Sequence, residues 1–190
     1  MWLIAAVVVQ FIVIAVLALV VLSLARQVGI LHERTAPAGL STKAADSIPI
    51  GGSLAAIQLT TLSDDGLLLA PGARQETTTL LFVSADCPIC RSVLPAYQQA
   101  LTADSQLSGW WVGDGSDAQQ FADYTRAQAI APERALLSQD LGLQLGIREL
   151  PALVVLDSDN RLLLREVLTG PRGLETALAQ LARPQGENNA

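Results

Sequence analysis

Cys87 and Cys90 are the only cysteines of the chain, and two residues separate them. A Cys-x-x-Cys pair can form a reversible disulfide, or it can supply two ligands to a metal ion. Here the pair follows an apolar and β-branched segment, 77–84, and precedes a segment with apolar residues at helical spacing, 88–103. A pair of cysteines at such a junction between strand and helix indicates thiol-disulfide chemistry.

The two cysteines have different predicted roles. A helix that begins at Pro88 places Cys87 at its N-cap. There the sulfur faces unpaired backbone N–H groups and the positive end of the helix dipole, which favour the thiolate over the thiol. Cys87 is therefore the predicted nucleophile. Cys90 lies one helical turn further on the same face, so it can attack a mixed disulfide on Cys87 and release the product.

Two other interpretations of the pair are weaker. A zinc site needs four ligands, but the chain has no third cysteine, and its single histidine, His32, precedes the expected domain. The sequence therefore predicts no metal site. A purely structural disulfide is disfavoured because the loop that it would close is short, and the entropic gain from a cross-link grows with loop length.

Composition excludes several classes of function. Of the 190 residues, 51% are hydrophobic and 16% are charged, which argues against a disordered or low-complexity chain. The net charge of -6 argues against a nucleic-acid partner. No phosphate-binding loop, catalytic carboxylate pair or nicotinamide or flavin motif is recognisable. We therefore expect no cofactor beyond a redox-active disulfide between Cys87 and Cys90.

The first part of the chain is almost wholly apolar. No residue of 2–25 is charged, and a segment of this length can cross a bilayer as one helix. A cleaved signal peptide is the alternative, because 23–25 resembles a cleavage site. The segment has no basic residue before it and exceeds the usual apolar core of a signal peptide, so an uncleaved anchor over 1–25 is favoured. We expect 26–53 to be a juxtamembrane segment and linker.

Charges near the anchor leave its orientation open. Arg26, Arg34 and Lys43 follow the apolar segment, and no charged side chain precedes it. Read alone, this bias predicts a cytoplasmic domain. The chemistry of the domain has to settle the question.

A folded domain is expected over 54–183, followed by a flexible tail over 184–190. We predict strands at 54–59, 67–69, 77–84, 109–112, 135–137, 152–156 and 161–167, and helices at 88–103, 117–129, 141–145 and 171–182. Such alternation of strand and helix predicts an α/β fold. Trp110 and Trp111 should face opposite sides of one strand, one in the core and the other at the surface.

Two segments resemble the thioredoxin superfamily. Residues 79–90 are similar to its central strand and active-site turn, with Pro95 at the position of the proline that kinks the following helix. Residues 145–156 are similar to the loop that ends in a cis-proline. The resemblance implies a thioredoxin-like fold, in which a central mixed sheet is flanked by helices. It also implies that Pro151 is cis, lies against the cysteines and leaves the Leu150 backbone to pair with a substrate.

The residues before the domain resemble one family within this superfamily. An anchor followed by residues such as those of 26–39 resembles the MauD family of membrane-anchored accessory proteins for methylamine dehydrogenase. The resemblance implies a single-pass inner-membrane protein with its domain in the periplasm. It also implies a role in maturing a client protein with cysteines, the disulfide-rich small subunit of methylamine dehydrogenase. A membrane electron donor is then needed to reduce the pair again.

The chain departs from the thioredoxin pattern at two positions. Asp86 replaces the tryptophan before the first cysteine, and Leu81 replaces a buried acid. Asp86 can supply a carboxylate for proton transfer, or it can be an exposed loop residue whose charge disfavours the thiolate. Ile89 replaces the histidine of strong oxidants and offers no hydrogen bond, which favours a reductase or isomerase. The missing acid also leaves open a non-catalytic, membrane-tethered chaperone that binds its client near Pro151.

Overall fold

The structure is a computed structural model, and it describes residues 2, 4, 7, 10–19, 47–115 and 117–181. The chain divides into two units, Met1–Ala44 and Ala45–Ala190. The predicted anchor, 1–25, and the linker, 26–53, lie only partly within the described residues. The predicted tail, 184–190, lies outside them.

The described part of the first unit is short. Residues 10–19 are helical, and their large apolar side chains are exposed, for example Phe11 at 72% and Leu19 at 67%. Among the residues that the structure describes, no helix combines the length and the apolar character needed to cross a bilayer.

Five strands of the second unit form a mixed sheet in the order β5-β4-β3-β6-β7. They are β3 (Thr77–Val83), β4 (Leu107–Gly113), β5 (Ala135–Leu137), β6 (Ala152–Leu156) and β7 (Leu162–Val167). β3, β4 and β5 run parallel, β6 is antiparallel to β3, and β7 is antiparallel to β6. The mixed α/β architecture predicted from the sequence is confirmed.

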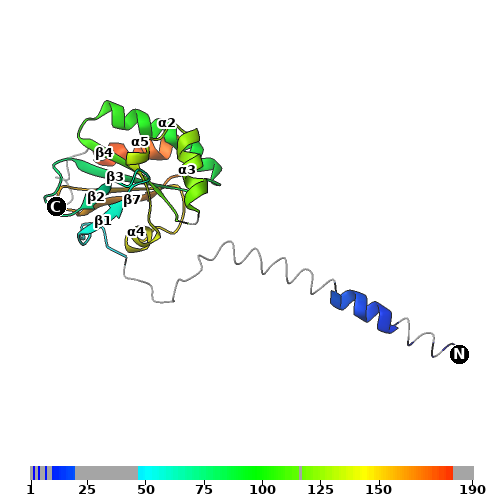
Figure 1. The fold of residues 1–190 in the computed structure, drawn as a ribbon. Coiled ribbons are helices and arrows are strands. Elements are labelled where there is room, and N and C mark those ends of the chain that lie inside the picture. Colours follow the sequence, from blue (N-terminus) through cyan, green and yellow to red (C-terminus); the bar gives the residue numbers. More distant parts are fainter. Residues whose placement is uncertain are drawn as a thin grey trace. The chain divides into compact units, whose positions relative to one another are not determined.

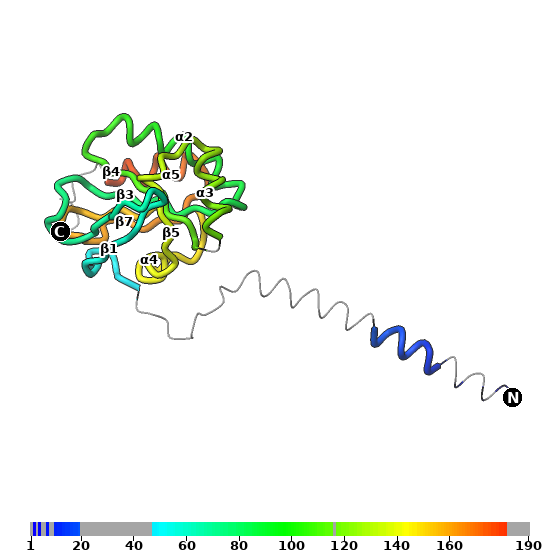
Figure 2. Tube along the Cα trace, viewed as in Figure 1, coloured from blue at the N-terminus to red at the C-terminus, as the bar shows by residue number. Residues whose placement is uncertain are grey.

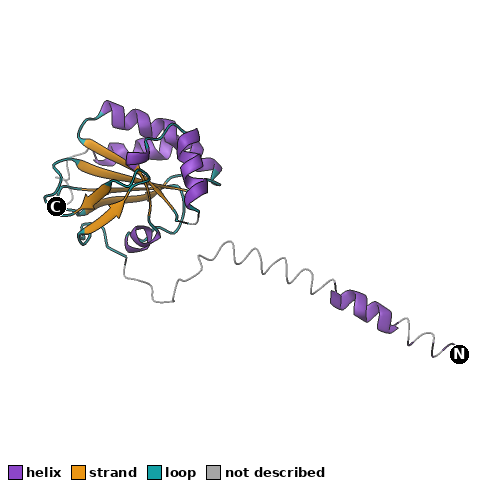
Figure 3. Cartoon of the chain, in the orientation of Figure 1, coloured by secondary structure: helices purple, strands orange, loops and turns teal. Residues whose placement is uncertain are grey.

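Helices and a hairpin cover the two faces of this sheet. The elements are the helices α2 (Pro88–Ala103), α3 (Ala118–Ala127), α4 (Gln139–Gln144) and α5 (Pro171–Leu181), and the hairpin strands β1 (Ile57–Thr60) and β2 (Gly66–Leu69). A short turn of 3-10 helix, η1 (Pro132–Arg134), precedes β5. α2, α3 and α5 pack on one face, and the hairpin and α4 pack on the other (Figures 1 and 3). α2 and α5, far apart in the sequence, lie side by side (Figure 2).

β3 lies at the centre of the sheet and is buried on both faces. Leu81 and Val83 belong to the core beneath α2, α3 and α5, whereas Leu80 and Phe82 belong to the core on the hairpin side. This alternation follows from the two-residue period of a strand. It explains why the segment reads as continuously apolar, as strands covered on both faces do. The end of β3 delivers the chain directly to the cysteines.

Most predicted elements lie close to their predicted bounds. The helix at 88–103 and the strands at 135–137 and 152–156 begin and end at the predicted residues. The remaining elements differ by a few residues at their ends. Side-chain caps fix two helix starts: Asp117 Oδ1 accepts a hydrogen bond from Gln120 N at 3.0 Å, and Ser138 Oγ accepts one from Leu141 N at 3.2 Å.

One prediction about the core is wrong. Trp110 and Trp111 face opposite sides of β4, as expected, but each is only 6% exposed, so neither forms a surface patch. The guanidinium carbons of Arg74 and Arg134 lie 5.1 and 5.0 Å from the centre of the Trp110 ring. Arg74 comes from the segment after β2 and Arg134 from η1, both distant in sequence from Trp110, and strand alternation alone does not reveal that they cover this indole.

Candidate active site

Cys87 is the N-cap residue of α2. Its backbone is extended (φ -88, ψ 112), and its sulfur accepts a hydrogen bond from Cys90 N at 3.2 Å. Pro88 occupies the first turn, where its missing N–H costs no helical hydrogen bond. The side chain is half-buried. The sulfur therefore lies at the start of a helix, bonded to a backbone N–H, and stays accessible to a partner.

Cys90 differs sharply from Cys87 in its surroundings. Its side chain is 0% exposed and belongs to the core formed with α3 and α5. Burial, and then a hydrogen bond to Cys87, raise the pKa of Cys90 to about 12. Both cysteines are free thiols in this structure. The pair therefore combines an accessible sulfur with a buried one that holds its proton at neutral pH.

Pro151 lies across from Cys87, at the start of β6. The Leu150–Pro151 peptide bond is cis, as the resemblance implies. The Cys87 thiol points at the Leu150 carbonyl oxygen, 3.9 Å from its sulfur. A hollow of about 250 Å³ adjoins this loop and is lined by 146–149, Ala152, Arg165 and Val167. The cis-proline loop and the accessible sulfur thus share one surface.

Hydrogen bonds from a residue of β7 hold the loop before Pro151 in place. Arg165 Nη1 donates hydrogen bonds to the carbonyl oxygens of Leu145, at 2.9 Å, and Ile48, at 3.2 Å. Gly146 has a φ of +67 and sits so close to Ser47 and Arg165 that a Cβ there would collide with both. Only glycine fits this conformation and this space. The position of Pro151 therefore depends on residues far from the cysteines in sequence.

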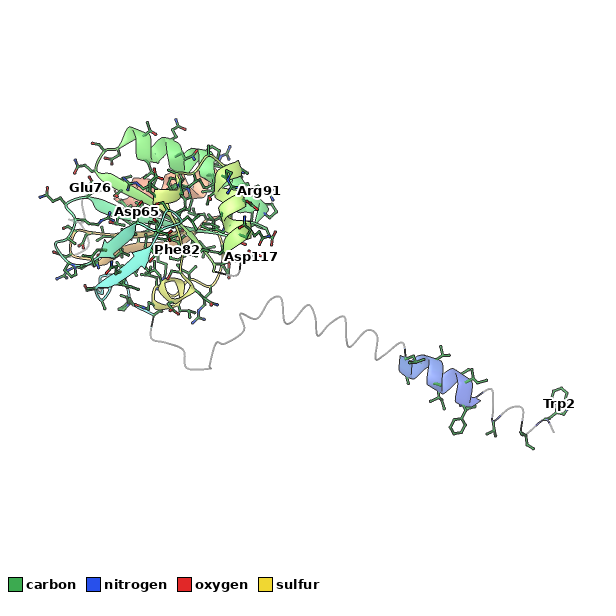
Figure 4. All side chains as sticks on the ribbon, viewed as in Figure 1. Trp2, Asp65, Glu76, Phe82, Arg91 and Asp117 are labelled. Carbon is green, nitrogen blue, oxygen red and sulfur yellow. The ribbon has the colours of Figure 1, made fainter. Side chains whose placement is uncertain are left out.

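The remaining predicted site residues are exposed at the surface around Cys87. Pro88 and Ile89 are exposed, Ile89 by 44%. Asp86 is exposed, and its Oδ1 accepts a hydrogen bond from Gln120 Nε2 of α3 at 3.0 Å. Its carboxylate is thus tied to the neighbouring helix. Arg91 and Asp117, labelled in Figure 4, mark the starts of α2 and α3 at the same end of the domain.

Leu81 is 0% exposed and lies in the same core as Cys90. The interior beneath the cysteines is therefore apolar at the place where an acid was expected from the family pattern. Two polar atoms of this core have no hydrogen-bond partner among the described residues: the Tyr124 hydroxyl and Trp111 Nε1. Sequence reasoning missed Tyr124, although its spacing from Phe121 on α3 is that of a buried helix face.

The residues present suit thiol chemistry. Among the described residues, no group of three or more His, Cys, Asp or Glu side chains could hold a metal ion. An accessible thiol at a helix start, a buried thiol one turn later and a partly exposed loop beside them can exchange disulfides with an extended segment of another protein.

Two curated relatives are similar over most of the chain. The methylamine utilization protein MauD of Methylobacillus flagellatus is 29% identical over 148 residues, which are 75% of this chain and 69% of that protein. The MauD protein of Methylophilus methylotrophus is 28% identical over 152 residues, 77% of this chain and 69% of that protein. No protein-family model matches the chain.

Solved structures share the fold. The thioredoxin domain of a thiol-disulfide oxidoreductase from Bacteroides vulgatus has a TM-score of 0.60 and 14% identity, covering 72% of this chain and all (100%) of that one. StoA of Bacillus subtilis has a TM-score of 0.54 and 17% identity, covering 65% and 96%. The chain has a thioredoxin-like fold and is similar to MauD proteins, as the sequence resemblance implies.

Proposed function

We propose that this chain is a membrane-anchored thiol-disulfide oxidoreductase of the reductase or isomerase type. The observation that carries the proposal is the contrast between the two sulfurs. Cys87 is partly exposed and accepts a backbone hydrogen bond at the start of α2, whereas Cys90 is fully buried one turn away. Thiol-disulfide exchange needs one thiol that is accessible to the client and a second, protected thiol that reacts only with the mixed disulfide.

In the proposed reaction, the Cys87 thiolate attacks one sulfur of a client disulfide. A bond forms between Cys87 and the client, the client disulfide breaks, and the second client sulfur leaves as a thiolate. Cys90 then loses its proton to solvent and attacks Cys87, so that the intramolecular disulfide forms and the client leaves as a second thiolate. The client gains two electrons and the pair loses two.

The surroundings of Cys87 support a reductase or isomerase over a strong oxidant. The exposed Ile89 offers no hydrogen bond to a thiolate, and Asp86 brings a negative charge next to Cys87 in sequence. Both features disfavour an unusually stable reduced form, which is what makes a strong oxidant. Net reduction of clients requires a dithiol donor in the membrane that returns two electrons to the Cys87–Cys90 disulfide.

The similar MauD proteins are methylamine utilization proteins. By analogy, we propose that the client is the disulfide-rich small subunit of methylamine dehydrogenase, and that the enzyme acts during its maturation. The contacts are expected near the cis Leu150–Pro151 bond, where an extended client segment can lie against Cys87.

The proposed location is the inner membrane, with residues 2–25 as a single-pass anchor and the domain in the periplasm. The apolar residues of 10–19 are exposed, and a helix that exposes apolar side chains on all sides suits a lipid environment. Disulfide chemistry suits an oxidising compartment, which favours the periplasm over the cytoplasm. A C-terminal reporter that is active only in the periplasm would agree with this topology; one active only in the cytoplasm contradicts it.

Complementation tests the function. Cells that lack this gene are supplied with the wild type, Cys87→Ser or Cys90→Ser, and mature methylamine dehydrogenase is measured. We expect the wild type to restore maturation and Cys87→Ser to lose it. A chaperone that binds the client near Pro151 without redox turnover is the competing function, which the apolar Leu81 site favours. It predicts full maturation with both variants.

A further inference from the structure

Arg165 is a cation whose hydrogen-bond partners are backbone carbonyl groups. It lies on β7 and is partly buried, and its Nη1 donates to the carbonyl oxygens of Leu145, at 2.9 Å, and Ile48, at 3.2 Å. Among the described residues, no carboxylate forms an ion pair with it. One Nη1 atom carries two hydrogens, so both bonds can exist at once. The guanidinium therefore joins two segments that are far apart in the sequence.

The end of α4 shows why Arg165 is needed there. A helix cannot bond its own last four carbonyl groups. Two of them are bonded by the residues that follow: Gly146 N donates to Leu143 O at 3.0 Å, and Ile147 N donates to Gly142 O at 2.8 Å. With Gly146 at a φ of +67, these are the two bonds of a Schellman motif.

The other two carbonyl groups are bonded from outside the helix. Gln144 O accepts a hydrogen bond from Ile48 N at 3.2 Å, and the carbonyl of the C-cap residue accepts the one from Arg165. Ser47 lies against Gly146, because a Cβ on this glycine would collide with the Ser47 side chain. A positive charge also suits the negative end of a helix dipole. The end of α4 is thus held by Arg165 and by one backbone segment.

That segment, 47–54, includes the end of the predicted linker and is itself bonded to β7. Gly51 N donates to Leu162 O at 2.7 Å, and Leu162 N donates to Gly52 O at 2.8 Å. Its backbone therefore continues the sheet beyond the first residues of β7. Arg165 bonds the end of α4 to a segment that is already fixed in position.

These bonds lie at the base of the loop that reaches the cysteines. Residues 147–150 connect the end of α4 to Pro151, whose carbonyl oxygen accepts a hydrogen bond from Leu168 N at 2.8 Å. The Leu150 carbonyl oxygen, between these two attachments, is 3.9 Å from the Cys87 sulfur. The loop is therefore held at one end by the sheet and at the other by the hydrogen bonds of Arg165.

We propose that Arg165 is a positioning residue, which holds residues 147–150 in the conformation that pairs with the extended backbone of a client. This inference rests on the proposed function. A client that meets an ordered loop loses less conformational entropy on binding. Arg165 acts on the loop and not on the sulfurs. It should therefore determine how strongly Cys87 prefers a polypeptide disulfide over a small disulfide that has no backbone to pair.

Two mixed disulfides with the same coloured aromatic thiol test this role. In one, the aromatic thiol is joined to the cysteine of a short extended peptide, and in the other it is joined to mercaptoethanol. Stopped-flow release of the coloured thiolate by the reduced full chain in detergent gives the rate of attack by Cys87. We expect the wild type to react faster with the peptide. Arg165→Met should reduce this preference by about tenfold and leave the rate with the small disulfide unchanged.

Arg161→Met is the matched control, because Arg161 is exposed and immediately precedes β7. It removes the same charge and should keep the wild-type preference. Arg165→Gln, whose shorter side chain cannot reach both carbonyl groups, makes the same comparison if Arg165→Met does not fold.

Three results overturn the inference while leaving the proposed function intact. The first is an unchanged preference in the Arg165 variant. The second is equal slowing with both disulfides, because a general loss of structure then explains the result. The third is a wild type that reacts equally fast with both disulfides, because the loop then gives the peptide no advantage.

Hydrogen exchange measured by mass spectrometry separates the inference from the proposed function. In the reduced full chain, the amides of 146–150 should exchange about tenfold faster in Arg165→Met than in the wild type, and Arg161→Met should not change them. If the wild type releases no coloured thiolate from either disulfide, the proposed function fails. Faster exchange confined to the Arg165 variant then supports the positioning role, and unchanged exchange overturns it.

Discussion

Cys90→Ser is expected to leave Cys87 covalently joined to its clients. The partly exposed Cys87 can still attack a disulfide, but the buried thiol that displaces the client is gone. Because intramolecular attack benefits from a very high effective concentration, the mixed disulfide should last at least about a thousandfold longer. Acid quenching, followed by non-reducing electrophoresis and mass spectrometry, detects the captured proteins and the linkage to Cys87.

Cys87→Ser is the matched control for this experiment, since it also replaces one sulfur by oxygen and keeps the other thiol. It should capture no client, because Cys90 is 0% exposed. Capture by Cys90 in that variant, with none by Cys87 in Cys90→Ser, would reverse the assignment of nucleophile and resolving thiol.

The largest effect on stability is expected at Leu81. This side chain is 0% exposed and lies at the centre of β3, in the core beneath the cysteines. Leu81→Ala should cost about 2–5 kcal/mol. Leu81→Asp should cost at least as much at neutral pH, because it also buries a charge without a partner. Chemical denaturation of the reduced protein gives both free energies of unfolding.

The pH dependence identifies the cause of the loss in Leu81→Asp. Burial raises the folded-state pKa of the new carboxyl above its value in the unfolded chain, so the penalty is relieved as pH falls below the folded-state value. Leu81→Ala should show no such recovery. Leu81→Met, which nearly conserves volume, should cost less than about 1.5 kcal/mol and serves as the control. Similar losses for Met and Asp would mean that this site is not apolar core.

The sequence predicted the cysteine geometry because that geometry is local. A proline after Cys87 begins a helix, and one helical turn then fixes Cys90 on the same side. The strand that precedes them is recognised by its continuous apolar run. These features depend on neighbouring residues alone, so they required no knowledge of the tertiary structure.

What the sequence did not predict depends on contacts between distant residues. The burial of Trp110 comes from Arg74 and Arg134, which join it only in the folded chain. The hydroxyl of Tyr124 reaches the core around Cys90 because α3 packs beside α2 on the same face of the sheet. Composition and spacing predict which face of a helix is buried. They do not predict which side chains of other helices that face contacts.

The apolar surroundings of Cys90 also make its deprotonation unfavourable. With Leu81 in place of an acid, none of the buried polar residues in the described part of the chain is a carboxylate that could accept the proton of Cys90. Burial, the largest cause of the raised pKa of Cys90, persists when Cys87 is held in a mixed disulfide, so only a small fraction of Cys90 is ionised near neutral pH. Resolution should therefore speed up with rising pH, by about tenfold per unit below that pKa.

Differential alkylation of the reduced native protein tests the contrast between the two sulfurs most directly. After a short treatment with iodoacetamide at about pH 8, peptide mass spectrometry locates the label. We expect modification of Cys87 and almost none of Cys90, which is 0% exposed, until the protein is unfolded, when both react. Equal labelling of the two thiols in the folded state, or labelling of Cys90 first, would contradict the account.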